Sequence, residues 1–354
     1  MTDCIVIGGG LIGMLSAREL KKAGMDVLVL DKGGLGQESS WAGGGILSPL
    51  HPWNYSDEVN ELASIGHQVY PQLAGELFEE SGIDPEYYRC GMLVLQSHKQ
   101  QISQQSRVLS WADRWKMQFF SVDSLAEMKS IAPGLSAAFE QGVWLPDVAQ
   151  MRNPRLVKAI KGSMDRLGIH YKENMDVKKI NIKNGKVKGV VTPDREINAD
   201  QVLVAGGAWT AALLKGLRQV PDIAPVKGQM IIYRGQPGLL NTILLAENRY
   251  LIPRKDGRIL CGSTIEHSGF DKSTSETVGQ KLQLSAVELF PGLAELPVEH
   301  HWSGLRPGSP AGEPYILRHN EIEGLYINAG HYRNGVILGI GSAQRISKMM
   351  ISDR

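Results

Sequence analysis

The stretch Cys4-Ile5-Val6-Ile7-Gly8-Gly9-Gly10-Leu11-Ile12-Gly13 decides the fold of this chain. Residues 4–7 are an uninterrupted apolar run, which is typical of a strand buried on both faces of a parallel sheet. The glycines follow at once with the spacing Gly-x-Gly-x-x-Gly. A helical pattern then continues to about Ala23 and ends before Gly24, a residue type that commonly closes helices. A second apolar run over 27–30 completes the pattern, so the sequence predicts a βαβ unit.

The glycine turn and the residue after the second strand predict a dinucleotide site. Gly8 allows the tight turn, Gly10 lets a pyrophosphate approach the backbone, and Gly13 lets helix and strand pack closely. The helix N-terminus offers free N–H groups and a positive dipole end to the phosphates. Asp31, 23 residues after Gly8, can accept hydrogen bonds from both ribose hydroxyls of an adenosine and would repel a 2′-phosphate. The motif therefore disfavours NADP, but by itself it does not separate NAD from FAD.

The composition excludes several classes of protein. The 354 residues are enough for two domains, and a net charge of +1 without a long run of like charges offers no basic surface for a nucleic acid or an anionic membrane. No apolar stretch approaches the about 18 residues that a spanning helix needs. Three cysteines without a Cys-x-x-Cys pair argue against a disulfide framework or a zinc site and favour a reducing compartment. Because no basic leader precedes the first strand, we expect a cytoplasmic protein without nucleic-acid or membrane partners.

Residues 33–50 form an irregular stretch rich in glycine and serine. The consecutive glycines 43–45 suit a backbone that lies close to a flat ligand, and the alternative is a surface loop. We favour the ligand, because Trp41, Ile46 and Leu47 would be poorly placed in water.

Periodicity predicts the remaining elements. Apolar residues at helical spacing predict a helix over 58–79, where Pro71 could cause a kink or a break, and a helix from Asn153-Pro154, with Asn153 as its cap, to Gly168. Further predictions are short helical patches over 106–132, a hairpin over 177–191 around Asn184-Gly185, a buried strand over 201–205, a strand-rich segment over 226–264, a strand over 325–329 and a helix that begins near Gly335. Parallel βαβ units interleaved with antiparallel strands indicate a nucleotide domain that is discontinuous in sequence.

Several segments along the chain carry a family resemblance. They are residues 7–13, 39–47, 204–209, 225–228, 249–254, 302–308 and 330–336. Together they resemble the FAD-dependent D-amino-acid oxidase family and, within it, the glycine-oxidising branch that serves thiamine biosynthesis. The resemblance covers almost the whole chain. Its first motif is generic, whereas Arg249-Tyr250-Leu251-Ile252-Pro253-Arg254, Trp302-Ser303-Gly304-Leu305-Arg306-Pro307-Gly308 and Gly330-His331-Tyr332-Arg333-Asn334-Gly335-Val336, in this order, are specific.

The resemblance implies an α/β fold, α+β overall. A Rossmann-like FAD-binding domain with a parallel sheet is expected from residues 1–85, 146–222 and 307–354. A substrate domain with an antiparallel sheet is expected from residues 86–145 and 223–306.

The resemblance also implies FAD as the cofactor, held noncovalently because none of the cysteines lies in a segment where relatives tether a flavin. It places Asp31 and Lys32 at the adenosine ribose and Val177 at the adenine side. It places Ser39, Ser40, Gly44, Gly45 and Ile46 along the flavin, and His331, Tyr332, Arg333, Asn334, Gly335, Val336 and Ile337 around the isoalloxazine end. The other residues expected to hold FAD are Gly8, Gly10, Leu11, Ile12, Gly13, Ala205, Gly206 and Trp209.

Three residues match the family positions that hold the substrate carboxylate, namely Tyr250, Arg306 and Arg333. An Arg fork can grip a carboxylate with two hydrogen bonds, and a Tyr hydroxyl adds another donor. Strand alternation predicts that Arg249 points away from Tyr250, whereas Arg254 shares its face and remains a rival for the carboxylate.

The histidines are expected to have structural roles. His300-His301 lacks the carboxylates or cysteines that would complete a metal site, so no metal is expected. For His331 a structural hydrogen bond is the preferred interpretation.

The resemblance implies oxidative deamination of glycine or another small amine by hydride transfer to flavin N5. Dioxygen would then reoxidise the flavin and give hydrogen peroxide, and the imine would serve thiazole formation or hydrolyse to glyoxylate and ammonia. The alternatives are a D-amino-acid or sarcosine oxidase, a dehydrogenase with another electron acceptor, a non-catalytic FAD module and an NAD-linked dehydrogenase. A homo-oligomer is expected, with the tetramer of relatives as the first candidate, and Ile46 and Ile265 are expected to line the pocket.

Overall fold

A six-stranded sheet forms one end of the molecule in the computed structural model, which describes residues 2–96 and 98–353. Its order is β19-β20-β13-β1-β2-β9, and the pairs are parallel except for the edge strand β19. The strands are β1 (Cys4–Ile7), β2 (Val27–Leu30), β9 (His170–Lys172), β13 (Gln201–Val204), β19 (Tyr315–Arg318) and β20 (Leu325–Ala329). The central strands β1, β13 and β20 are buried on both faces, which explains their continuous apolar runs.

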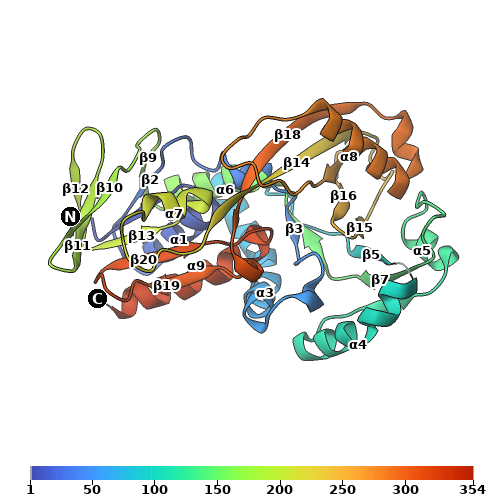
Figure 1. The fold of residues 1–354 in the computed structure, drawn as a ribbon, viewed down its shortest axis with the longest axis horizontal. Coiled ribbons are helices and arrows are strands. Elements are labelled where there is room, and N and C mark those ends of the chain that lie inside the picture. Colours follow the sequence, from blue (N-terminus) through green and yellow to red (C-terminus); the bar gives the residue numbers. More distant parts are fainter. Residues whose placement is uncertain (1, 97, 354) are drawn as a thin grey trace.

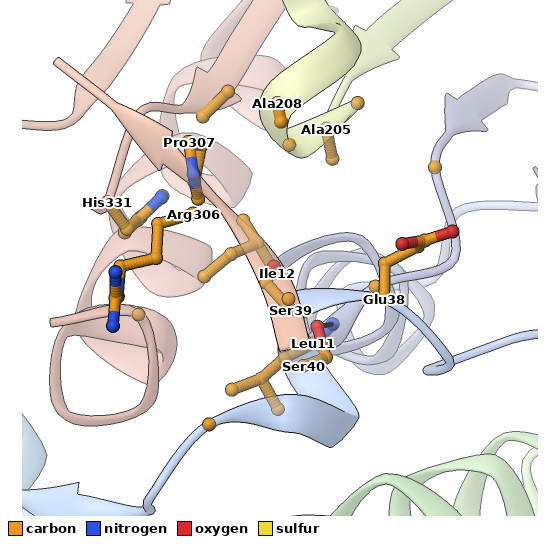
Figure 2. Close-up of a pocket in the computed structure, with 18 of the residues that line it drawn as sticks. Leu11, Ile12, Glu38, Ser39, Ser40, Ala205, Ala208, Arg306, Pro307 and His331 are labelled. Carbon is orange, nitrogen blue, oxygen red and sulfur yellow. Dashed lines mark hydrogen bonds between the residues drawn. The ribbon is translucent and has the colours of Figure 1, made fainter. Parts of the chain in front are cut away.

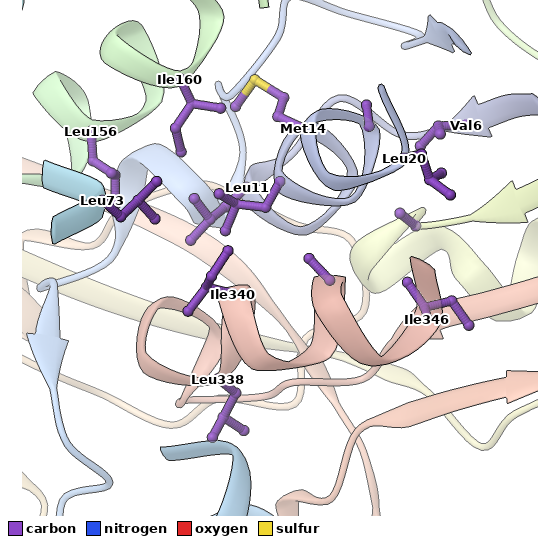
Figure 3. Close-up of a cluster of buried hydrophobic side chains, with 14 of the residues drawn as sticks. Val6, Leu11, Met14, Leu20, Leu73, Leu156, Ile160, Leu338, Ile340 and Ile346 are labelled. Carbon is purple, nitrogen blue, oxygen red and sulfur yellow. The ribbon is translucent and has the colours of Figure 1, made fainter. Parts of the chain in front are cut away.

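Helices cover one face of this sheet. They are α1 (Leu11–Lys22), α3 (Asp57–Ser81), α6 (Asn153–Arg166) and α9 (Gly335–Ser352). Figure 3 shows Leu11 and Met14 of α1 among Ile340 of α9 and Leu156 and Ile160 of α6, all of which belong to one buried apolar cluster. The other face packs against the predicted hairpin, now a three-stranded sheet of β10 (Lys179–Lys183), β11 (Lys186–Val191) and β12 (Glu196–Asn198).

Helix α3 is a single helix that contains Pro71. Proline lacks the N–H of a helical hydrogen bond, so a break at this position was a reasonable expectation. The helix persists because its buried face, including Tyr70 and Leu73, packs in the same cluster as α6 and α9. At α6 the predicted cap was wrong by one residue, since Asn153 is the first helical residue and its side-chain amide donates to the Ser40 carbonyl at 2.8 Å.

An eight-stranded sheet forms the other end of the molecule, with the order β18-β14-β17-β16-β15-β5-β7-β6. Its strands are β5 (Met92–Gln96), β6 (Phe120–Val122), β7 (Gln141–Leu145), β14 (Ala224–Arg234), β15 (Ile243–Ala246), β16 (Arg249–Pro253), β17 (Arg258–Gly262) and β18 (Val298–Gly308). The long strands β14 and β18 run from one end of the molecule towards the other (Figure 1). The sheet is antiparallel, as expected, except that β5 and β15 pair in parallel where two distant chain segments meet.

The remaining elements connect these layers. In the segment 106–132, the predicted helical patches correspond to the end of α4 (His98–Trp115) and to α5 (Leu125–Ile131), whereas the strand β6 between them was not predicted. Both chain ends lie near β10–β12, whereas α4, α5 and α8 (Glu276–Leu289) lie at the opposite end (Figure 1). The other elements are α2 (Ser39–Ala42), α7 (Thr210–Leu213), the small sheet of β3 (Ile46–Leu47), β8 (Ala149–Gln150) and β4 (Tyr88–Arg89), and the 3-10 turns η1 (Pro52–Asn54), η2 (Gly207–Trp209), η3 (Pro291–Glu295) and η4 (Pro310–Gly312).

The large sheet therefore draws its strands from residues 92–145 and 224–308. The exact division into two domains remains a prediction. Within the described residues, no helix is both long enough and apolar enough to span a membrane.

A buried arginine joins three of the helices. Arg18 of α1 is 1% exposed, and its guanidinium donates to Glu76 and Glu80 of α3, at 2.8 and 2.9 Å, and to Ser163 of α6 at 2.9 Å. These charge-assisted bonds hold the pKa of Glu76 far below its usual value, at about 2, and Lys22 adds to this effect.

Replacing Arg18 with Met should lower the free energy of unfolding at neutral pH by about 3 kcal/mol, because the two carboxylates would lose a buried partner. Glu76, with a depressed pKa, stabilises the folded state fully above pH 4.5 and loses that contribution as the pH falls towards 2. The difference in the free energy of unfolding between Arg18→Met and wild type, measured by urea denaturation, should therefore shrink as the pH falls over this range. Lys22→Met, at a more exposed site, is the control and should cost less than about 1 kcal/mol. An Arg18→Met protein as stable as wild type would show that the network does not stabilise the helices.

Candidate active site

A cavity of about 510 Å³ lies at the carboxyl ends of the parallel strands and continues under the large sheet. Its size and position are typical of ligand sites in open α/β folds. Figure 2 shows Arg306 and His331 at one end of the cavity and Glu38 at the other, with Leu11, Ser39 and Ser40 between them. The wall is thus assembled from segments that lie far apart in the sequence.

The glycine turn after β1 has the geometry that the sequence predicts. Gly8 has a φ of +108°, and a Cβ at this position would lie 2.3 Å from the Ala205 carbonyl oxygen. A Cβ on Gly13 would lie 1.9 Å from the Gly8 carbonyl oxygen, so this glycine permits the close packing of α1 on the strand. Gly10 lines the cavity at the start of α1. The turn therefore leaves backbone, without side chains, facing the cavity.

Asp31 ties the glycine turn to the end of β2. Its carboxylate accepts hydrogen bonds from the Gly9 N–H at 2.6 Å and from the Gly33 N–H at 2.8 Å. Asp31 also lines the cavity, so its remaining lone pairs can accept from a ribose. Sequence reasoning missed Gly9, whose amide fixes the orientation of this carboxylate.

Lys32 and Trp209 form a second contact at this end. The Lys32 ammonium lies 3.4 Å from the centre of the Trp209 ring, and burial lowers the pKa of Lys32. The other stacking partner of Trp209 is Phe270, with 5.4 Å between ring centres, and the neighbouring Lys272 pairs with Glu38 at 3.1 Å. The loop after β17 therefore contacts two lining residues, which the sequence did not predict.

Glycines 43–45 line the cavity after the short helix α2. Gly45 has a φ of +78°, and a Cβ there would lie 1.9 Å from the Met151 carbonyl oxygen. A Cβ on Gly44 would lie 2.6 Å from the Ile252 side chain. Packing against Met151 therefore requires glycine at position 45, and both glycines line the cavity; their close approach to a ligand stays a prediction. The argument from Trp41 was wrong, however, because this side chain is 43% exposed and packs edge-on against Trp302.

Arg306 enters the cavity from β18. Its guanidinium donates to the Ser263 hydroxyl at 2.7 Å and to the Thr264 carbonyl at 3.1 Å, which fixes its direction. A Cβ on Gly228 would lie 2.1 Å from Arg306 Nη2, so a glycine on the neighbouring strand makes room for the charge. Burial lowers the pKa of Arg306; Tyr250 opposes this shift, and the charge of Arg333 adds to it.

Arg333 and Tyr250 line the same cavity as Arg306. Arg333 Nη1 donates to Asn248 Oδ1 at 2.8 Å, whereas Nη2 is a buried donor without a partner among the described residues. Both arginines donate to neutral oxygens. Two guanidinium groups thus converge on the cavity, neither paired with a carboxylate among the residues that the structure describes, and the residues named for the substrate are brought together.

The two neighbouring arginines behave differently. Arg249 points away from Tyr250, as predicted, and pairs with Glu288 of α8 at 3.0 Å. Arg254 shares the face of Tyr250, also as predicted, but it is not a rival for the carboxylate. Its guanidinium lies behind the cavity wall, where it donates to the Gly44 carbonyl at 2.8 Å.

Comparison with known proteins identifies the family. A sequence model of the family described as FAD dependent oxidoreductase (DAO) matches residues 3–349. The chain belongs to this family. The match selects FAD from the two dinucleotides that the glycine motif left open, and it makes the protein an FAD-dependent oxidoreductase.

Individual relatives agree with this assignment. The chain is similar to glycine oxidase of Pseudomonas aeruginosa, with 42% identity over 98% of this chain and 94% of that protein. It is 30% identical to the bifunctional protein ThiO/ThiG of Synechocystis over its whole length, which spans 52% of that protein. The crystal structure of glycine oxidase from Geobacillus kaustophilus superposes with a TM-score of 0.94 at 28% identity, covering 99% of this chain and 94% of that one.

The cavity fits the FAD of this family. Glycine backbone lines the cavity after β1 and at residues 43–45, and the N-termini of α1 and α9, whose free N–H groups suit phosphate and other negative charge, both face it. The following predicted FAD residues line the cavity: Gly8, Gly10, Leu11, Ile12, Asp31, Lys32, Ser39, Ser40, Gly44, Gly45, Ile46, Val177, Ala205, Gly206, Trp209, His331, Tyr332, Arg333, Gly335 and Val336. Their individual contacts with FAD stay predictions.

Three predicted FAD residues do not line the cavity. Gly13 acts in helix packing, and Asn334 is a buried residue that precedes α9. Ile337 is fully buried and packs against Gly66 of α3, because the first turn of α9 directs it into the core. Ile46 lines the cavity as expected, whereas Ile265 is 41% exposed and is not part of the wall.

Sequence reasoning also missed part of the wall. The missed lining residues include Ser48, Leu50, Asn153, Met175, Asp176, Lys178, Met230, Gly304, Pro307 and Asn328. Most of them lie within a few residues of a quoted motif, and that proximity was the available signal.

His331 has the structural hydrogen bond that was expected. His331 is buried and shares a hydrogen bond with the Ser342 hydroxyl at 2.9 Å, and burial lowers its pKa to about 3, so it is neutral. In the part of the chain that the structure describes, no group of three His, Cys, Asp or Glu side chains is arranged to hold a metal.

Proposed function

We propose that this FAD-dependent oxidoreductase is an oxidase that deaminates glycine, and more slowly other small amines or D-amino acids. Dioxygen is the electron acceptor, and the products are the imine, or glyoxylate and ammonia after hydrolysis, together with hydrogen peroxide. The observation that carries the proposal is the convergence of Arg306 and Arg333, with Tyr250, on the cavity that fits FAD. The glycine oxidases and ThiO/ThiG proteins among the relatives support both the substrate and a supply of imine for thiamine thiazole synthesis.

The arginines account for recognition of an amino acid. Arg306 is held by neutral acceptors and Arg333 retains a buried free donor, so a substrate carboxylate completes the hydrogen bonding of the site. The Tyr250 hydroxyl, close to Arg306, supplies one more donor. Because both charges are partly withdrawn from water, their attraction for an anion is stronger than on an open surface.

The protein contributes to the oxidation mainly by positioning the substrate. Bound FAD supplies the acceptor for the two electrons that leave the Cα–H bond of the amine. The protein fixes the carboxylate and thereby aligns the Cα, which lowers the entropic part of the barrier. The N-terminus of α9, which begins at Gly335 without a side-chain cap, offers free N–H groups that favour negative charge at this end of the cavity.

We extend the proposal to the state of the enzyme in the cell. The free cysteines Cys4, Cys90 and Cys261, two of them fully buried, favour a reducing compartment such as the cytoplasm. A homo-oligomer, with a tetramer as the first candidate, and noncovalent FAD complete the proposal. Size-exclusion chromatography with light scattering tests the oligomeric state, and release of FAD by acid precipitation tests whether FAD is bound noncovalently.

Anaerobic titration of the yellow holoenzyme with a panel of amines tests the function. Glycine should bleach the flavin, sarcosine and D-alanine should bleach it more slowly, and methylamine, which lacks a carboxylate, should bleach it least. Oxygen uptake with the same panel, with and without an artificial acceptor, separates an oxidase from a dehydrogenase. Preference for D-alanine or sarcosine would favour the alternative oxidases. Failure of every amine to bleach the flavin would contradict the proposal and favour a non-catalytic FAD module.

A further inference from the structure

Arg254 is a buried cation with no assigned role. It follows β16 directly and is 5% exposed. Its guanidinium donates to Gln150 Oε1, to the Met151 carbonyl at 3.1 Å and to the Gly44 carbonyl at 2.8 Å. Its Nε is buried without a partner among the described residues. All of these acceptors are neutral, so the charge is solvated by dipoles and not by a carboxylate.

The nearest carboxylates are engaged elsewhere. Glu86 and Asp256 both pair with Arg152, at 3.3 and 2.9 Å. Burial is the main cause that lowers the pKa of Arg254, to about 10, and the charge of Arg152 adds to it. This pKa still leaves Arg254 protonated at neutral pH. A buried charge without a counter-ion is costly, which argues for a function.

The position of this charge suggests the function. Gly44 and Gly45 line the FAD cavity, and Arg254 holds the Gly44 carbonyl from behind. Met151 connects Arg254 to the glycine wall as well, because its N–H donates to the Gly45 carbonyl at 2.9 Å and its own carbonyl accepts from Arg254. The guanidinium therefore fixes the glycine wall and lies directly behind it, on the side away from the cavity.

We propose that Arg254 is a positioning residue that tunes the bound FAD: it fixes the Gly44–Gly45 wall, and its uncompensated charge stabilises the reduced cofactor relative to the oxidised cofactor. Two-electron reduction adds negative charge to the flavin, and a cation across a single layer of backbone, in a medium of low polarity, favours that state. The inference rests on FAD binding and not on glycine as the substrate.

The midpoint potential of bound FAD tests this inference, measured by anaerobic reduction with xanthine and xanthine oxidase against a reference dye. Arg254→Gln removes the charge but keeps an amide donor. In this variant the equilibrium constant for reduction of bound FAD should fall at least tenfold, which lowers the midpoint potential by about 30 mV for a two-electron couple. Gln150→Glu keeps Arg254 and the oxygen that accepts from it, adds a compensating carboxylate and gives up the Nε2 donor to the Pro253 carbonyl; it should lower the potential in the same direction. Arg254→Lys keeps the charge, so its potential should stay near that of wild type while FAD binds several-fold more weakly because the fork is lost.

Arg249→Gln is the matched control, since Arg249 begins the strand β16 that Arg254 follows, faces away from the cavity and is paired with Glu288. It should leave both the potential and the FAD affinity unchanged. An unchanged potential in Arg254→Gln or in Gln150→Glu would overturn the inference, as would a fall in Arg254→Lys as large as that in Arg254→Gln. If Arg254→Gln does not yield folded protein, Gln150→Glu and Arg254→Lys decide the question. Because the reductant is not an amine, the result is independent of whether glycine is the substrate.

Discussion

Replacing Arg333 with Ala should reduce kcat/KM for glycine by about 10³-fold while FAD stays bound. The substitution removes a cation whose Nη2 is buried and unpartnered, and a bound carboxylate would lose a charge-assisted pair. Such a loss costs about 2–5 kcal/mol, and each 1.4 kcal/mol is a factor of ten. The kcat/KM of Arg333→Lys for glycine should lie between those of wild type and Arg333→Ala, because lysine keeps the charge but loses the planar fork.

The matched comparisons make this result specific. Arg249→Ala, on the far side of β16, should oxidise glycine like wild type. Methylamine has no carboxylate, so its slow oxidation should be much less affected by Arg333→Ala than the oxidation of glycine. Steady-state oxygen uptake and the absorbance of bound flavin are the measurements. Normal glycine oxidation by Arg333→Ala would show that the carboxylate is held elsewhere.

Replacing Gly8 with Ala should weaken FAD binding at least about 100-fold relative to wild type, so that the protein purifies without most of its flavin. The backbone at Gly8 has a φ of +108°, which costs an alanine of the order of 1–3 kcal/mol. The new Cβ would also lie 2.3 Å from the Ala205 carbonyl oxygen, which belongs to backbone and cannot move without displacing the end of β13. The turn that carries the N-terminus of α1 would therefore shift away from the position of the pyrophosphate.

Gly24→Ala is the control for backbone strain alone. Gly24 also has a positive φ, +86°, but a Cβ there meets nothing within 4 Å, and the residue lies at the far end of α1. This variant should lose a little stability and keep its full FAD content, measured as the ratio of absorbance at the flavin band to that of protein. A Gly8→Ala protein that purifies yellow with full flavin content would contradict the role of this turn.

The fold was predictable from the sequence where short-range patterns determine it. The run 4–7, the glycine turn and the run 27–30 each encode their own conformation, through continuous burial and through a φ that only glycine tolerates easily. Pairing between distant segments is different. The parallel contact of β5 with β15 depends on which edges meet after the chain has folded, and the alternation of apolar residues says nothing about that choice.

The same distinction holds in the site. The sequence determined that a dinucleotide binds after β1, because Gly8, Gly13 and Asp31 act within one βαβ unit. The tertiary structure decided that Arg306 and Arg333 share a cavity and that Arg254, on the same face as Tyr250, lies behind its wall instead. A strand pattern gives the face of a side chain but not what covers that face. The packing of the large sheet against the glycine loop determines that, through contacts between residues more than 200 positions apart, such as Gly44 and Arg254.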